Sequence, residues 1–246
     1  MNRVNASVGT WTPLQSNSLS WSIVKQVRTA LYQQQLKSGD FLGSESILAQ
    51  QFGVSRMAAR DALRTLEALG IVEIRMGVRG GAWIAEGNPD RFSDALSVQL
   101  MLIGLSPAEI FDAQGAIVVA SVTLAAQRAN NQDILEIKNA LKACEIVASD
   151  ADKFSDASLN FQESLVRASA NRVLLAQFRA LRVVLDPILK PNTTATTIRR
   201  LIKSNRALLV AVENKDVETA ARLMRERVES VKTTILLAKQ QEMMTS

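Results

Sequence analysis

The chain has 246 residues, of which 47% are hydrophobic and 22% charged, with a formal net charge of +5, one cysteine and no histidine. The absence of histidine excludes a Ser-His-Asp triad, a Cys-His pair, an imidazole metal ligand and a histidine pH switch. A single cysteine, Cys144, cannot form an internal disulfide or a cysteine-rich zinc site. What remains is carboxylate, lysine or metal–oxygen chemistry, or binding without chemistry.

The length predicts one or two domains, at roughly 150 residues per domain. The longest nearly uncharged apolar stretches, residues 96–105 and 115–126, are shorter than the ~18–20 residues that a membrane span needs. Residues 1–20 lack the apolar core of a signal peptide. We therefore expect a cytoplasmic protein with no membrane partner. The excess of Lys and Arg allows a polyanionic partner without requiring one.

The first 70 residues predict an arm followed by three helices. Residues 1–18 are rich in Asn, Ser and Thr and predict a flexible N-terminal arm. Apolar residues at helical spacing predict a helix from Leu19 to the Ser-Gly-Asp sequence at 38–40. Ser44 can cap a short second helix, and Ser55 can cap a third helix that ends at Gly70.

A glycine-rich hairpin is predicted next. Residues 71–75 alternate in a β-favouring pattern, glycines follow at 77, 80 and 81, and residues 82–84 are Ala-Trp-Ile. This pattern is typical of a two-stranded hairpin. Three helices with a tight turn, followed by a hairpin, predict a winged helix-turn-helix over residues 19–86.

Basic residues in this region predict a DNA-binding surface. Arg56, Arg60 and Arg64 are spaced i, i+4 and i+8, which places them on one stripe of the third helix. Arginine near the N-terminus of such a helix suits reading of the major groove, because it can pair with guanine through two hydrogen bonds. Arg75 and Arg79 flank the hairpin tip, where they could contact the DNA backbone or minor groove. The alternative is that these arginines are solvated surface charges.

Residues 87–90, Gly-Asn-Pro-Asp, predict a linker, and residues 91–240 predict a helical domain. Ser106 followed by Pro107 and Glu109 has the spacing of a helix start with a capping box. Further breaks divide the region into six or seven helices. The predicted fold is therefore mainly α, with a winged helix-turn-helix preceding an antiparallel all-α bundle.

The N-terminal region resembles the DNA-binding domain of the GntR family of bacterial transcription regulators. The resemblance rests on Gly-Asp-Phe-Leu-Gly-Ser-Glu at 39–45, Phe-Gly-Val-Ser-Arg at 52–56, Arg-Asp-Ala-Leu at 60–63 and Gly-Ile-Val at 70–72. The family usually has proline where this chain has Gly43, and a basic residue that reaches DNA where it has Ser46. The residues expected at the DNA from the resemblance and the basic stripe are Ser44, Ser46, Ser55, Arg56, Met57, Ala58, Arg60, Arg75, Met76, Gly77 and Arg79.

The helical region resembles the FCD-type ligand-binding domain of the FadR subgroup, most clearly in residues 110–126, 158–174 and 204–228. Many domains of this type hold a divalent metal through one aspartate and three histidines, and an organic acid completes the site. At the matching positions this chain has Ser158, Gln162, Asn205 and Arg227, which are poor metal ligands. Two further pocket positions, usually Arg and Glu, are Gln114 and Val118. We therefore expect no metal and no other cofactor.

The residue pattern places the same polar groups on apolar helix faces. Arg227, for example, lies at helical spacing from Leu223 and Val231. Burying a polar group without a partner costs ~1–3 kcal/mol, and a buried charge costs more. Two explanations remain open. Arg227 is satisfied by neighbouring amides in a collapsed cavity, or it anchors an anionic effector.

These observations predict a homodimeric transcription regulator, a repressor rather than an activator, that binds operator DNA and responds to a small anionic metabolite such as an organic, acyl or aromatic acid. The alternative is a ligand-independent DNA-binding regulator with a decayed pocket. An enzyme is not expected, because no carboxylate pair shares an inward face and no phosphate loop or cofactor motif is present.

Overall fold

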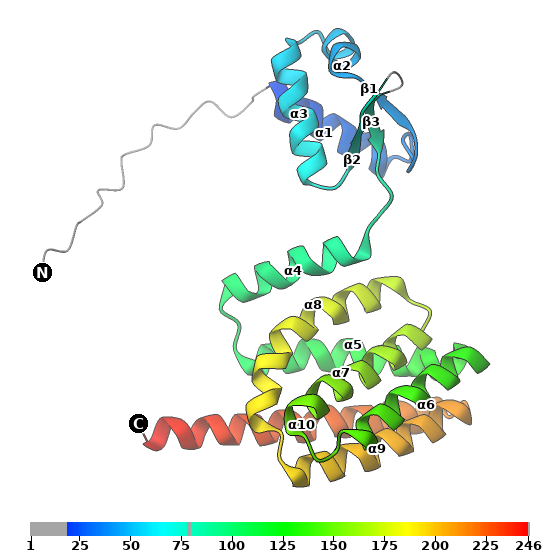
Figure 1. The fold of residues 1–246 in the computed structure, drawn as a ribbon, viewed down its shortest axis with the longest axis vertical. Coiled ribbons are helices and arrows are strands. Elements are labelled where there is room, and N and C mark those ends of the chain that lie inside the picture. The colour runs from blue at the N-terminus through cyan, green and yellow to red at the C-terminus, as the bar shows by residue number, and fades with distance from the viewer. Residues whose placement is uncertain (1–18, 78–79, 246) are drawn as a thin grey trace, which may run out of the picture. The chain divides into compact units, whose positions relative to one another are not determined.

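The computed structural model describes residues 19–77 and 80–245, with side chains described as far as residue 240. The chain divides into two compact units, residues 1–88 and 89–246, and each has its own hydrophobic core. Figure 1 shows the small mixed unit and the larger helical unit. The predicted arm at 1–18 and Arg79 lie outside the described residues.

The first unit combines three helices with a small sheet. In chain order it contains α1 (Leu19–Tyr32), β1 (Phe41–Gly43), α2 (Glu45–Phe52), α3 (Arg56–Ala68), β2 (Val72–Arg75) and β3 (Gly81–Ile84). The strands are antiparallel in the order β1-β3-β2. The helices and the β2–β3 hairpin agree with a winged helix-turn-helix.

Two local features of this unit differ from what the sequence predicted. The sheet has a third strand, β1, where Phe41 pairs with Trp83 and the two ring centroids lie 5.0 Å apart. Three residues are too few to show the alternation that identifies a strand. In addition, α1 ends at Tyr32 rather than at residues 38–40, because Gln34 takes a left-handed conformation with φ of 58°. The turn at residues 37–40 is a separate feature closed by Asp40.

Helix caps and a shared core fix α2 and α3. Ser44 accepts a hydrogen bond from the Ile47 amide, and Ser55 accepts one from the Ala58 amide, so each serine satisfies an otherwise free N–H. Gly53 ends α2 with φ of 61°, a left-handed conformation that suits glycine. The apolar side of α3 packs with α1 in a core of residues including Ile23, Val24, Val27, Ala59, Ala62, Leu63 and Leu66.

The second unit is all helical, as expected. It contains α4 (Pro89–Ile103), α5 (Pro107–Arg128), α6 (Asn131–Ile146), α7 (Ala151–Ala168), α8 (Arg172–Leu189), η1 (Lys190–Asn192), α9 (Ala195–Glu213) and α10 (Val217–Thr245). Ser106 and Glu109 form the predicted capping box at the start of α5. Helix α4 begins at Pro89, so the second half of the predicted linker is helical. Proline is favoured in a first helical turn because its missing N–H has no acceptor there.

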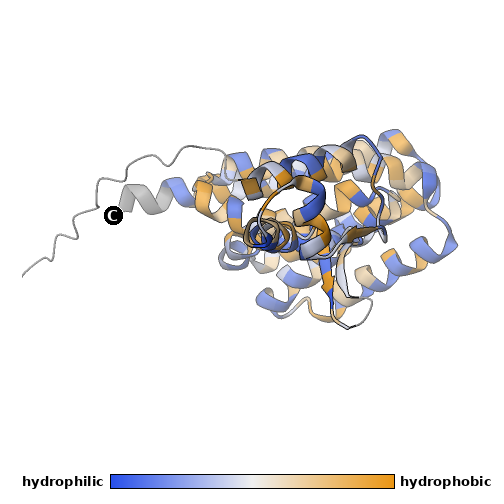
Figure 2. Cartoon of the chain, turned by 90° about the horizontal axis from the view of Figure 1, so that it is seen from above, coloured by the Kyte–Doolittle hydropathy of each residue, from blue (hydrophilic) through white to orange (hydrophobic). Residues whose placement is uncertain are grey.

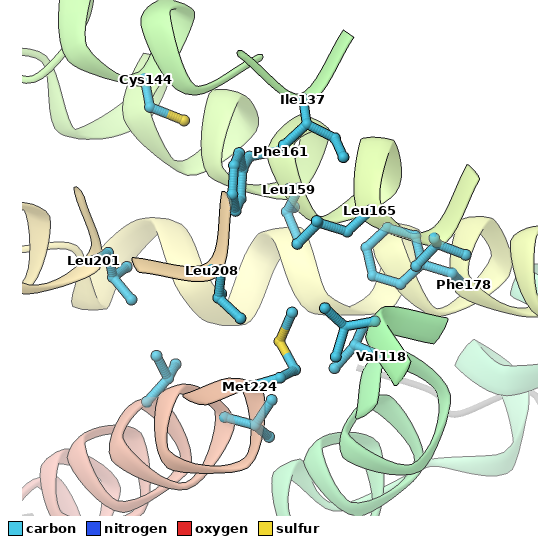
Figure 3. Packing of buried hydrophobic residues seen from close by; sticks show 14 of the residues in the cluster. Val118, Ile137, Cys144, Leu159, Phe161, Leu165, Phe178, Leu201, Leu208 and Met224 are labelled. Carbon is cyan, nitrogen blue, oxygen red and sulfur yellow. The ribbon is translucent and has the colours of Figure 1, made fainter. Parts of the chain in front are cut away.

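The helices of this unit enclose one apolar interior. Val118 of α5, Phe161 of α7, Leu208 of α9 and Met224 of α10 converge in Figure 3, and all four are buried. Hydrophilic and hydrophobic residues alternate along the helices in Figure 2, the pattern of helices that bury one side. Buried polar residues on α5, α7, α9 and α10 interrupt this apolar interior.

Helix α5 meets the length and hydropathy of a membrane span, which differs from the expectation that no segment would do so. Its charged ends lie outside the uncharged stretch at 115–126, so the complete helix is longer than that stretch. A core helix passes the same test, and α5 contributes Phe111, Val118, Val122 and Ala125 to the interior.

Candidate functional site

A groove in the first unit brings together most of the residues predicted to contact DNA. It lies between α2, α3 and the β2–β3 hairpin and has a volume of about 550 Å³. Four arginines line it, and so do the exposed ends of α2 and the hairpin. The predicted residues in its wall are Ser44, Ser46, Arg56, Arg60, Arg75, Met76 and Gly77, and Arg64 lies beside them.

The N-terminus of α3 lies at the groove, which Arg56, the first residue of the helix, lines. Ser55 caps the helix, and Arg56 and Met57 follow as exposed residues, with Met57 65% exposed. Ala58 is half-buried, and its amide is occupied by the Ser55 hydroxyl. Helix N-termini attract phosphate because their amides and the helix dipole favour negative charge. Arg56 therefore lies where both a phosphate and a base edge could be contacted.

Arg60 is held by a residue that the sequence analysis did not select. Its Nε and Nη2 donate to the two carboxylate oxygens of Glu45 at 2.8 and 2.9 Å. The hydrogen bond from Arg60 lowers the pKa of Glu45, and the same bond raises the pKa of Arg60. Because the two residues are 15 positions apart and on different helices, helical spacing alone gave no signal of this pair.

The wing carries one partly restrained arginine. The Arg75 guanidinium lies 4.8 Å from the centre of the Trp83 ring, and its Nη2 is 3.8 Å from Glu73. Met76 is 93% exposed at the hairpin tip. Arg75 can still turn towards a ligand, because its side chain is about half exposed, but stacking on Trp83 favours the position beside β3.

In the second unit, the predicted polar residues meet around a buried arginine. Arg227 of α10 is 5% exposed. Its Nε donates to Asn205 Oδ1 at 3.2 Å and its Nη2 donates to Ser158 Oγ at 2.8 Å. Beside it, Gln114 Nε2 donates to Gln162 Oε1 at 2.8 Å. Four helices thus bring five of the six predicted effector residues together.

Arg227 lacks the negative partner that a buried charge usually requires. Burial lowers the pKa of the guanidinium to about 10. Within the described chain, neither an aspartate nor a glutamate contacts it, and its two hydrogen bonds use only two of five N–H donors. The described residues also hold no group of three Asp, Glu or Cys side chains placed for a metal ion. The arrangement suits an anion better than a cation.

A cavity of about 30 Å³ adjoins Arg227, and its wall includes Ser158, Gln162 and Gln114. This is space for one or two water molecules. Ser155 also lines the cavity. Its buried Oγ has no hydrogen-bond partner in the described structure, and neither does the buried Nδ2 of Asn205, a residue outside the cavity lining. Ser155 and the exposed Arg200, which were not among the predicted effector residues, also line the cavity.

Val118 is the predicted effector residue that lies elsewhere. It is 1% exposed and belongs to the apolar interior rather than the cavity wall. On α5 it follows Gln114 by one turn, which places it deeper in the bundle. The remaining wall comes from the end of α8, η1, α9 and α10.

Comparison with known proteins gives matches to both units. Residues 19–80 match the model of "Bacterial regulatory proteins, gntR family", and residues 109–230 match that of the FCD domain. The chain is 31% identical over 140 residues to the HTH-type transcriptional regulator LutR of Bacillus subtilis, which covers 57% of this chain and 63% of that protein, under two thirds of its length.

Two further relatives extend over more of the chain. The putative L-lactate dehydrogenase operon regulatory protein of Escherichia coli is 29% identical over 227 residues, covering 88% of this chain and 86% of that protein. The solved structure of a Streptococcus agalactiae GntR protein matches with a TM-score of 0.59 at 17% identity, covering 87% of this chain and 99% of the other, which shows a shared fold. The relatives' names are those of regulators, in agreement with the expectation that the chain is not an enzyme.

Proposed function

The chain belongs to the GntR family of bacterial regulatory proteins and carries an FCD domain, and on this premise we propose that it is an operator-binding repressor controlled by a small anionic metabolite. The first unit binds DNA through the groove lined by Arg56, Arg60, Arg64 and Arg75. The second unit binds the metabolite beside Arg227. The protein acts in the cytoplasm, where operator DNA is found.

The observation that carries the effector proposal is the buried Arg227 guanidinium without a carboxylate partner. A buried charge costs free energy unless it is paired. An anionic ligand supplies the missing charge and accepts from the unused N–H donors. The Ser155 hydroxyl, buried and without a partner in the described part of the chain, offers a further contact.

The active species is proposed to be a homodimer. One recognition helix reads a half-site, and a two-fold symmetric operator needs two of them at a fixed spacing. Effector binding then changes the relative population of two arrangements of the dimer, only one of which matches the operator. The ligand must favour one arrangement by a few kcal/mol to have this effect.

A second candidate function is favoured by the small volume of the cavity. At about 30 Å³ it holds water but no organic acid, and Arg227 already donates to Ser158 and Asn205. On this account the protein binds DNA without responding to a ligand. The effector account requires the cavity wall to move.

One experiment separates the two candidates. DNA bound by the intact protein is selected from a random pool, and its affinity is then measured with and without a panel of organic acids. If the effector account holds, at least one acid weakens DNA binding by the unmodified protein. The Arg227→Met variant should then bind DNA normally without acid and should no longer respond when the acid is added. A panel without effect on DNA affinity, and without effect on the melting temperature, supports the ligand-independent regulator.

A further inference from the structure

A second arginine lines the same cavity as Arg227. Arg200 lies on α9 and is exposed, and its Nη2 is 3.4 Å from Thr234 Oγ1 on α10. In the described structure Arg200 forms no ion pair, so its charge is compensated only by solvent. The cavity therefore has one buried guanidinium and one at the solvent side.

The two guanidiniums lie at different levels along α10. Thr234, which marks the level of Arg200, is seven residues beyond Arg227. Seven residues of α-helix correspond to two turns, or about 10 Å. Val231 lies between these two levels and lines the cavity as well. The cavity is thus bounded along α10 by a cation at each end and an apolar side chain between them.

The rest of the cavity wall also combines apolar and polar residues. Leu189, Leu201 and Ile235 supply apolar surface, and Thr193 and Thr197 line the cavity together with Arg200. Ser155 supplies a buried Oγ that has no partner among the described residues. Of the described residues that line the cavity, none is an aspartate or a glutamate, so two positive charges face it without a negative one.

We propose that the effector is a short linear dicarboxylate, with one carboxylate on Arg227, the other on Arg200 and its methylene groups against Val231, Leu201 and Leu189. The proposal rests on the effector function proposed above and specifies its ligand class. The two carboxylates neutralise the two guanidiniums, and each carboxylate can accept two parallel hydrogen bonds from its own guanidinium. A monocarboxylate leaves one cation uncompensated and binds more weakly.

Binding requires the cavity to enlarge, and the least regular part of its wall is the segment around Leu189. Pro187 lies inside α8 and removes a helical hydrogen bond there. The chain then passes through η1, one short turn of 3₁₀ helix, before α9 begins. Outward displacement of this segment, which carries Leu189, Asn192 and Thr193, opens space between Arg227 and Arg200.

The test uses the intact protein with matched pairs of acids. Succinate, glutarate and adipate are compared with butyrate, valerate and hexanoate by titration calorimetry and by the shift in melting temperature. At least one dicarboxylate is expected to bind about tenfold more tightly than its monocarboxylate of equal chain length. Inorganic phosphate binding as tightly as the best dicarboxylate would overturn the two-ended ligand.

Variants assign the two ends. Arg200→Gln should remove the preference for the dicarboxylate and leave monocarboxylate binding, whereas Arg227→Gln should abolish binding of both, and Arg227→Lys should restore part of it. Arg199→Gln removes a neighbouring exposed charge that does not line the cavity and serves as the control. A preference that survives in Arg200→Gln, or equal binding of both acids to the unmodified protein, contradicts the dicarboxylate while the effector function stands. Failure of all acids to bind contradicts both.

Discussion

The Arg60 guanidinium on α3 is fixed by two parallel hydrogen bonds to the Glu45 carboxylate on α2, at 2.8 and 2.9 Å. This relationship joins the two helices of the helix-turn-helix across the groove that we propose as the DNA-binding face. Three N–H donors of Arg60 remain for DNA, but the negative charge of Glu45 offsets the positive charge of Arg60. The unpaired positive charge of α3 therefore rests on Arg56 and Arg64.

Arg56 should contribute more to DNA affinity than Arg60. Arg56→Ala is expected to weaken binding to a selected DNA by ~1–3 kcal/mol if it contacts a base, and Arg60→Ala by less, because Glu45 already offsets the Arg60 charge. The loss in Arg60→Ala includes repulsion of DNA by the Glu45 carboxylate that this variant leaves unpaired. The double variant that combines Arg60→Ala with Glu45→Gln should recover part of the DNA affinity lost in Arg60→Ala. Electrophoretic mobility shifts measure the three affinities. Arg28→Ala, on α1 and outside the groove, is the control, and normal binding by both arginine variants refutes the assigned face.

Low pH should reduce the folding stability of the first unit, because it protonates Glu45. Its pKa is lowered by the hydrogen bond from Arg60, so the folded state releases this proton more readily than the unfolded state. The resulting stabilisation is present above the ordinary pKa of 4.5 and is lost as pH falls through the lower folded value. Thermal melts between pH 3 and 6 should therefore show a smaller pH dependence in Glu45→Gln. An unchanged dependence would show that the pair does not form in solution.

Glu163 should be important for the stability of the second unit. Its carboxylate accepts from Arg167, Arg179 and Arg182, and its side chain is 14% exposed. Arg179 also donates to Asp90 at the start of α4, at 2.7 Å. Glu163→Gln leaves these three arginines, of which Arg179 and Arg182 are partly buried, with one fewer negative charge, and should lower the free energy of unfolding in urea by about 1–3 kcal/mol.

The control for this loss is Glu145→Gln. Glu145 pairs with Arg206 alone and its side chain is 35% exposed, so the expected cost is below about 1 kcal/mol. Equal losses in the two variants would mean that the arginines around Glu163 are as well solvated as a surface pair.

Val118 should affect folding and not ligand choice. It is buried among α5, α7 and α10 and does not line the cavity. Val118→Ala is expected to lower the free energy of unfolding by about 1–3 kcal/mol, since it removes buried methyl groups and leaves a void. The exposed Val98→Ala should change it by less than about 0.5 kcal/mol. If Val118→Ala instead changes the selectivity among acids at constant stability, this valine belongs to the site.

Cys144 should be unreactive in the folded protein. It is fully buried on α6, and burial raises the pKa of its thiol to about 11. The thiolate is the reactive form, so iodoacetamide at pH 8 should label the native protein slowly and the urea-unfolded protein rapidly. Because the unfolded thiol ionises first, its contribution to stability is lost as pH rises from about 9 towards 11. Rapid labelling of the native protein would show that this part of the bundle opens.

Features set by short-range rules could be predicted from the sequence. Ser44, Ser55 and Ser106 each cap a helix because a hydroxyl at that position satisfies a free amide whatever the rest of the chain does. The inward position of Arg227 followed from helical spacing, and its neighbours Ser158, Gln162 and Asn205 followed from the resemblance to the FCD domain.

Contacts between distant residues were not predictable in the same way. Glu45 and Arg60 meet because α2 and α3 pack together, and no local pattern encodes that contact. Arg200 was not selected as a site residue, since an exposed helical position has the same sequence pattern beside a cavity as beside solvent. Conversely, Val118 was assigned to the pocket by position in the family, although one helical turn separates it from the polar cluster.

The central claim is that Arg227 is a fixed cation that binds the anionic effector. Its most direct test is an experimental structure of the intact protein in crystals saturated with the tightest-binding acid. We predict that a carboxylate accepts hydrogen bonds from the Arg227 guanidinium, with the segment around Leu189 displaced and the cavity larger than about 30 Å³. An unenlarged cavity without bound acid, in which Arg227 keeps only Ser158 and Asn205 as partners, would contradict the claim.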